Sequence, residues 1–216
     1  IFGSDGGATR ISQSMGANLK LFEGVQWFSF NHNWATGHLH AMGSLLGKGI
    51  LPNLQSFDLD STRIASDALA TLLRGLEQSA CVDNLQHLDL SSYSICPEGA
   101  EVLGLAIGRD ILPSLRDLTI SYNPGLSDEG VTSLALGLQA SSRTKLKTLH
   151  LNSMGMGDAG LKSLAEAIQR GALEECSNLD ASNNSPSLRN VFPFVTALRS
   201  GGRLRNLMYL NFTQGH

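Results

Sequence analysis

An apolar triplet of the form L-x-x-L-x-L recurs at a nearly constant spacing along the chain, once in roughly 30 residues. A fixed period of this size is typical of solenoids, in which each repeat packs mainly on its neighbours. The sequence therefore predicts an extended array of repeats and not a globular domain built around one core. The predicted strands start near the first residue of each triplet, which is Val25, Leu54, Leu85, Leu115, Leu146, Cys176 or Leu207.

Each repeat combines a strand pattern with a helix pattern. The triplet predicts a short strand, because alternate side chains of a strand point to opposite faces. In the stretches 128–138 and 158–168, apolar residues recur four apart, which places them on one stripe of a helix. The positions where these helices should begin hold Ser127 or Asp128 in the first stretch and Asp158 in the second, and we expect N-caps there. Strands joined in this way must pair in parallel, with helices on one face of the sheet.

The stretch Leu115–Asn123, which reads LRDLTISYN and is followed by Leu126–Gly130, resembles the leucine-rich repeat of the ribonuclease-inhibitor-like class. The resemblance covers nearly the whole chain. It implies an α/β horseshoe, with a parallel sheet on the concave side and helices on the convex side.

The chain departs from the family pattern in several places. The asparagine expected eight residues after the first leucine is present as Asn33, Asn123 and Asn184. In the sixth repeat, Pro193 falls inside the expected helix, so we expect that helix to be kinked or shortened and the repeat to be irregular. In three other repeats, the asparagine position is occupied by Thr62, Tyr93 and Met154.

The two ends of the chain predict a fragment of a longer solenoid. Residues Asp5–Met15 match the helical halves that begin at Asp128 and Asp158, so the chain is expected to open in the middle of a repeat. It stops at His216, soon after the seventh strand, and neither end shows a polar capping unit. We expect residues 1–216 to form a single leucine-rich-repeat domain of about seven repeats.

Composition narrows the function classes. The formal net charge of −3 and the pI of about 6.1 argue against a nucleic-acid-binding protein, which needs clustered Lys and Arg. No apolar run approaches the ~20 residues that a membrane-spanning helix needs. The three cysteines, Cys81, Cys96 and Cys176, lack the paired spacing of a disulfide framework or a zinc site. Reduced thiols favour an intracellular compartment.

One motif suggests a cofactor. Residues 155–160 read G-x-G-x-x-G after a predicted strand, which is the spacing of a dinucleotide-binding turn. The repeat offers a simpler interpretation, because Gly160 falls where Gly130 and Gly99 fall in other repeats. We therefore expect no cofactor. We also expect no enzyme activity, since no nucleophile has an evident base. The remaining histidines are expected to be solvated, and they are His32, His38, His40 and His216.

The open face of the predicted sheet is more informative. Alternation places on it the residues two, four and six positions after each triplet start. These positions are polar apart from Trp27 and Tyr209, they include five aspartates, and they contain no Lys or Arg. Asp58 and Asp89 should lie side by side, and His87 should lie beside Asp117.

Three interpretations of this face remain open. The carboxylates are solvated or bonded to neighbouring hydroxyls, or they attract a basic protein partner, or they bind a metal ion through Asp58, Asp89, His87 and Asp117. A flat sheet lets few ligands converge on one ion, which disfavours the metal. The proposed protein-binding residues are Trp27, Asp58, Asp60, His87, Asp89, Asp117, His150, Asp180 and Tyr209.

The sequence thus predicts a protein–protein interaction module, such as a scaffold or adaptor, with an acidic concave face. The alternative is a structural accessory subunit of a large assembly, which would use its helices and its open ends. A regulator of a GTPase or an immune-receptor-type repeat domain is a further alternative, which rests only on the family resemblance.

Overall fold

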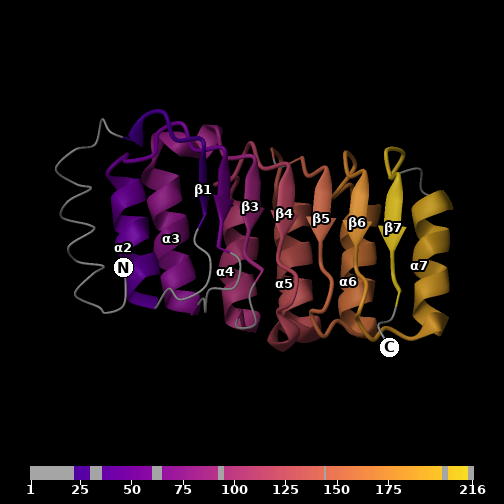
Figure 1. Cartoon of the computed structure of the whole chain (residues 1–216). Helices are drawn as coiled ribbons and strands as arrows, with labels where there is room; N and C mark the ends of the chain where they lie inside the picture. Colours follow the sequence, from indigo (N-terminus) through magenta and orange to yellow (C-terminus); the bar gives the residue numbers. More distant parts are fainter. Residues whose placement is uncertain are drawn as a thin grey trace.

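A computed structural model of the chain describes residues 22–29, 36–59, 65–91, 95–143, 145–200 and 204–213. Seven parallel strands form one sheet in sequence order, and the helices lie side by side on one face of it (Figure 1). Each strand begins two residues after a triplet start. The strands are β1 (Trp27–Ser29), β2 (Ser56–Asp58), β3 (His87–Asp89), β4 (Asp117–Thr119), β5 (Thr148–His150), β6 (Asn178–Asp180) and β7 (Tyr209–Asn211).

The α-helices alternate in length along the chain. α2 (Thr36–Gly47), α4 (Pro97–Gly108) and α6 (Asp158–Gln169) have 12 residues each. The intervening helices are longer by one or two residues, and they are α3 (Ser66–Gln78), α5 (Ser127–Ala140) and α7 (Leu188–Ser200). Two short 3-10 helices, η2 (Ala80–Asp83) and η3 (Pro124–Leu126), complete the described elements. Neighbouring repeats therefore differ slightly in helix length.

The core is a set of apolar rows that run along the solenoid. The pairing of the strands stacks Phe57, Leu88, Leu118, Leu149 and Leu179 directly beside one another, and all five are buried. Burying one such side chain contributes ~1.5–3 kcal/mol. Because each row continues from one strand to the next, the apolar triplets fix the register of the whole sheet.

Glycines set how closely neighbouring helices pack. A Cβ at Gly43 on α2 would lie 2.5 Å from the carbonyl oxygen of Thr71 on α3, so the two backbones touch. Gly104, two repeats after Gly43, plays the same role between α4 and α5. The equivalent position two repeats further along the chain is Ala165 on α6. A methyl group there is consistent with looser packing of α6 against α7.

Two asparagines bond consecutive turns together after the strands. Asn123 is fully buried, and its Oδ1 accepts a hydrogen bond from the Ile95 N–H of the preceding repeat at 2.9 Å. Its Nδ2 donates to the carbonyl oxygens of Leu90 and Ile120. Asn184 is also buried, and its Oδ1 accepts from the N–H of Met154, which occupies the asparagine position of its own repeat. The replacement at Met154 is thus accommodated by the asparagine of the next repeat.

The prediction that Asp128 and Asp158 cap their own helices is wrong. The N-caps of α5 and α6 are Leu126 and Gly157, and neither makes a side-chain capping bond. The carboxylate of Asp128 instead accepts from the N–H groups of the following repeat, and Asp158 does the same to Ser187. Each aspartate therefore joins two repeats.

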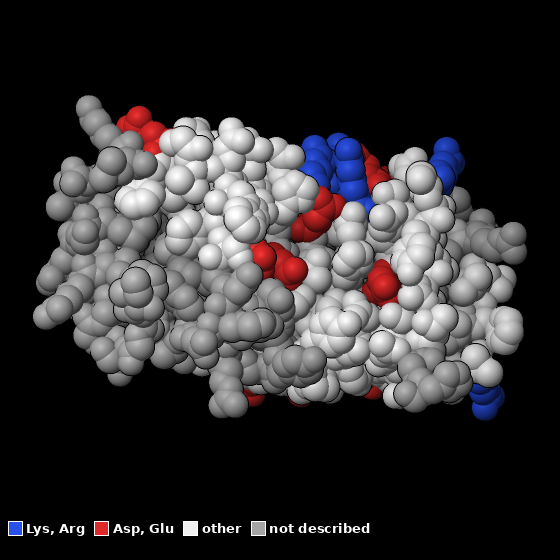
Figure 2. Space-filling model, viewed as in Figure 1, with Lys and Arg blue, Asp and Glu red and all other residues white. Residues whose placement is uncertain are grey.

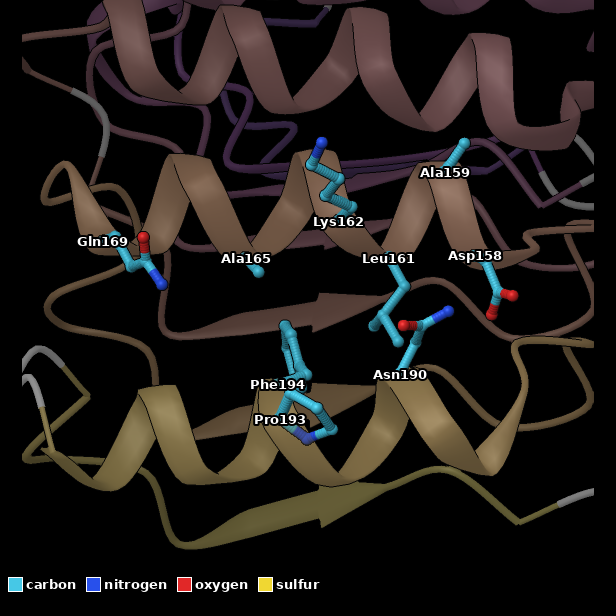
Figure 3. A pocket seen from close by; sticks show the side chains of 9 residues that line it. All are labelled: Asp158, Ala159, Leu161, Lys162, Ala165, Gln169, Asn190, Pro193 and Phe194. Carbon is cyan, nitrogen blue, oxygen red and sulfur yellow. The ribbon is translucent and has the colours of Figure 1, made fainter.

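The predicted shortening of the helix in the sixth repeat is also wrong. α7 runs through Pro193 and has 13 residues, as α3 has. What differs is the packing on α6, where a groove of about 450 Å³ opens between the two helices. Figure 3 shows Leu161 and Ala165 pointing from α6 toward α7, and Phe194 pointing back toward α6.

Candidate functional site

The strand face is the open face of the sheet, and its side chains form two rows that the pairing of the strands defines. Both rows have the register that the sequence predicts. The first consists of Trp27, Ser56, His87, Asp117, Thr148, Asn178 and Tyr209, and the second of Ser29, Asp58, Asp89, Thr119, His150, Asp180 and Asn211. The proposed residue Asp60 lies outside the described residues.

Several aspartates of the strand face accept local hydrogen bonds. Asp58 and Asp89 are direct neighbours on β2 and β3, as predicted. The Ser29 hydroxyl donates to Asp58 Oδ2 at 3.1 Å, and the Ser91 N–H donates to Asp89 Oδ1 at 2.8 Å. Asp180 accepts from the N–H two residues further on in the same way as Asp89. These bonds agree with the structural interpretation of the carboxylates.

His87 and Asp117 form a close side-chain contact on this face. The two residues are paired across β3 and β4, and His87 Nδ1 lies 2.5 Å from Asp117 Oδ2. The bond orients the imidazole across the strands. The residues that the metal interpretation needs, which are these two with Asp58 and Asp89, do not converge. Among the described residues no group of three or more His, Cys, Asp or Glu could hold a metal ion.

Exposed large side chains lie at the two ends of the strand face. Trp27 on β1 has 63% of its surface exposed, and Tyr209 on β7 has 48%. Met208, which precedes Tyr209, is 86% exposed and was missed by the sequence analysis. Its place in the repeat could have indicated it, because Met208 lies one residue after a triplet start, and only the positions two, four and six residues after each start were used.

Arg116 and Lys147 also lie one residue after a triplet start. Together with the nearby Lys145 they form a group that we call the basic edge. Arg116 and Lys147 directly precede β4 and β5, and the N–H of Lys147 donates to the carbonyl oxygen of Arg116. Glu175 lies between two of these cations, 3.5 Å from Arg116 and 3.1 Å from Lys145. Figure 2 shows basic side chains gathered at the upper edge of the molecule with acidic side chains below them on the strand face.

The backbone N–H groups of the G-x-G-x-x-G stretch are hydrogen-bonded within the protein. The N–H groups of Gly157 and Gly160 both donate to Asp128 Oδ1, at 2.6 and 2.8 Å. A Cβ at Gly155 would lie 2.5 Å from the carbonyl oxygen of Pro124 in the preceding repeat. The glycines therefore serve the contact between repeats, and the N–H groups that would bind a pyrophosphate already bind a carboxylate.

The described cysteines and histidines lie partly in the core and partly at the surface. Burial raises the pKa of the Cys176 thiol to about 11, and burial likewise raises the pKa of Cys81. All three cysteines are free thiols. His38 is 4% exposed, so the prediction of a solvated side chain is wrong for it, while His40 lies 3.5 Å from Asp67 at the surface. His32 and His216 lie outside the described residues.

Comparison with known proteins agrees with this architecture. A family model described as Leucine Rich repeat matches residues 112–135 and 143–165. These two stretches are leucine-rich repeats, and the other strand–helix units continue their period and register, so the fold is an α/β leucine-rich-repeat solenoid. Leucine-rich repeats generally mediate protein–protein interaction. No curated protein matches the sequence. In the part of the chain that the structure describes, every helix is too short or too polar to cross a membrane.

Proposed function

We propose that this chain is a protein–protein interaction module whose strand face binds a partner with a basic surface. The observation that carries the proposal is the composition of the two strand rows. Their described positions include four aspartates, which are Asp58, Asp89, Asp117 and Asp180, and no Lys or Arg.

The chemistry of the face suits recognition better than catalysis. A surface of one charge sign accelerates encounter with a partner of the other sign and disfavours partners of the same sign. Large exposed side chains such as Trp27 and Tyr209 are typical anchors, because they bury much area at little cost in side-chain entropy. An open sheet lacks the walls that exclude water from a reaction.

The test compares two double variants, one on the strand face and one on the helix side of the molecule. Asp58→Lys with Asp89→Lys reverses charge on the strand face, and Glu77→Lys with Glu101→Lys makes the same net change on the exposed sides of α3 and α4. Proteins captured from the source cells by the wild-type chain are quantified at low and at high salt. We expect the salt-sensitive partner to be lost with the first variant and kept with the second. Equal binding by both variants would exclude the strand face.

A structural accessory subunit is the second candidate, and apolar surface on the helix side favours it. Leu105 on α4 and Leu136 on α5 are half exposed or more, and the groove between α6 and α7 has apolar walls. Cross-linking mass spectrometry on the native complex separates the candidates through amines such as Lys48 and Lys162 on the helix side. Links to a fixed set of partners at constant stoichiometry would indicate a built-in subunit, and few or variable links a transient module.

A further inference from the structure

The strand face is acidic, and a basic edge lies beside it. The aspartates lie in the two rows of the strands themselves, with Asp58 and Asp89 paired on β2 and β3. The basic edge of Arg116, Lys145 and Lys147 lies at the start of β4 and β5. Figure 2 shows blue side chains at the upper edge, with red side chains beside them and further down the face.

The basic edge keeps an excess of positive charge. Glu175 is the acidic neighbour of both Arg116 and Lys145, so one carboxylate faces two cations. Lys147 is exposed, and it forms no ion pair with any residue that the structure describes. A carboxylate brought to this edge by a partner would therefore meet charge that is not already neutralised.

We propose that the partner of the strand face is a protein segment with charges in a fixed order, with basic residues over β2 and β3 and acidic residues over the start of β4 and β5. The inference rests on the proposed function and names the chemistry of the partner. It commits to one binding direction, because reversing the segment would place like charges against each other.

The geometry of the sheet sets the spacing of the two charged groups. Lys147 lies two strands from Asp89 and three residues nearer the strand start in the paired register. With about 4.8 Å between strands and about 3.3 Å per residue, the two backbone positions are roughly 14 Å apart. An extended segment covers that distance in about four residues. The partner segment should therefore place about four residues between its basic and acidic groups.

Synthetic peptides labelled with fluorescein test this order directly. A block peptide has four Lys, a neutral spacer of four Gly and Ser, and four Asp, and it is made in both chain directions. A lysine peptide replaces the four Asp by Ser, and an alternating peptide has the block composition with Lys and Asp interleaved. Binding to the wild-type chain is measured by fluorescence anisotropy at low ionic strength, where exposed charges are least screened.

We expect the block peptide to bind roughly three- to ten-fold more tightly than the lysine peptide, as two exposed ion pairs would produce. Lys147→Gln should remove most of that gain, while the matched control Lys162→Gln on α6 should leave it unchanged. The inference is wrong, and the proposed function stands, if the lysine peptide binds and the block peptide binds no more tightly. The same conclusion follows if the alternating peptide binds as tightly as the block peptide. If no peptide binds, the proposed function fails with it.

Discussion

At the scale of single residues, Asn123 is a buried polar side chain whose loss should be costly. It is fully buried, and it bonds the Ile95 N–H and the carbonyl oxygens of Leu90 and Ile120. Asn123→Ala would leave these backbone groups buried without their partner, at ~1–3 kcal/mol each for those that water cannot reach. We expect the free energy of unfolding, measured by urea titration, to fall by about 2–4 kcal/mol.

The same substitution at an exposed asparagine provides the control. Asn53 donates one hydrogen bond to the Glu23 carbonyl oxygen at the surface, at 2.7 Å. Asn53→Ala should change the free energy of unfolding by no more than ~0.5 kcal/mol. Similar losses from both variants would show that the burial of Asn123 is not what makes it important.

Residue spacing predicts the strand register but not the bonds between repeats. The triplets place Asp58 beside Asp89 because apolar side chains alternate with surface ones, and this pattern is local in sequence. The bonds from Asp128 to Gly157 and Gly160 join residues 29 and 32 positions apart. An aspartate at a helix start has the same local pattern whether it caps its own helix or the next one, so the sequence could not distinguish the two.

At the scale of helices, glycine pairs decide how closely α2 approaches α3. Gly→Ala inside a helix normally stabilises it, by ~1 kcal/mol. At Gly43 the added methyl would lie 2.5 Å from the Thr71 carbonyl oxygen, which cannot move without shifting α3. We expect Gly43→Ala to destabilise the protein by about 1–3 kcal/mol, the usual range for overpacking, as a lowered unfolding midpoint in urea.

Gly47 on the same helix is the matched control. A Cβ there would lie 3.0 Å from the Gln78 side-chain oxygen, which is the mobile end of a flexible side chain. Gly47→Ala should therefore be neutral or slightly stabilising. A stabilising effect at both positions would mean that the backbones of α2 and α3 do not touch.

The alternation between neighbouring repeats could have been predicted from the sequence. Gly43 and Gly104 are separated by twice the basic period, and Ala165 continues the series at the same interval. A search for one short repeat averages over this alternation. The looser contact between α6 and α7 follows from the packing of the actual side chains, including Phe194 and Pro193, which a periodicity cannot describe.

At the scale of the whole molecule, contacts between neighbouring repeats hold the solenoid together, and aspartates form part of them. The carboxylate of Asp110, after α4, accepts hydrogen bonds from the segment 141–143 after α5. Partial burial acts to raise the pKa of Asp110, but these hydrogen bonds outweigh it and the pKa lies below its usual value. Hydrogen bonds from Asn190 and from the Ser187 N–H likewise lower the pKa of Asp158.

These lowered pKa values predict how stability depends on pH. A carboxyl whose pKa is lower in the folded state binds its proton more weakly there than in the unfolded chain, so its ionised form stabilises the fold. That contribution is complete above the ordinary carboxyl pKa of about 4, and it is lost as the pH falls through the folded-state value. We expect the urea midpoint of the wild-type protein to fall on acidification below about pH 4. In the double variant Asp110→Asn with Asp158→Asn, the slope of the midpoint against pH should be shallower.

The exposed pair Glu77→Gln and Glu101→Gln is the control, because it removes the same number of carboxylates from the outer sides of α3 and α4. The wild-type slope should persist in this control, since its carboxylates accept no hydrogen bond from another described repeat. If both double variants flatten the slope equally, overall charge governs acid unfolding. If only the aspartate variant does, the carboxylates between repeats determine the acid stability of the solenoid, and the apolar rows alone do not account for it.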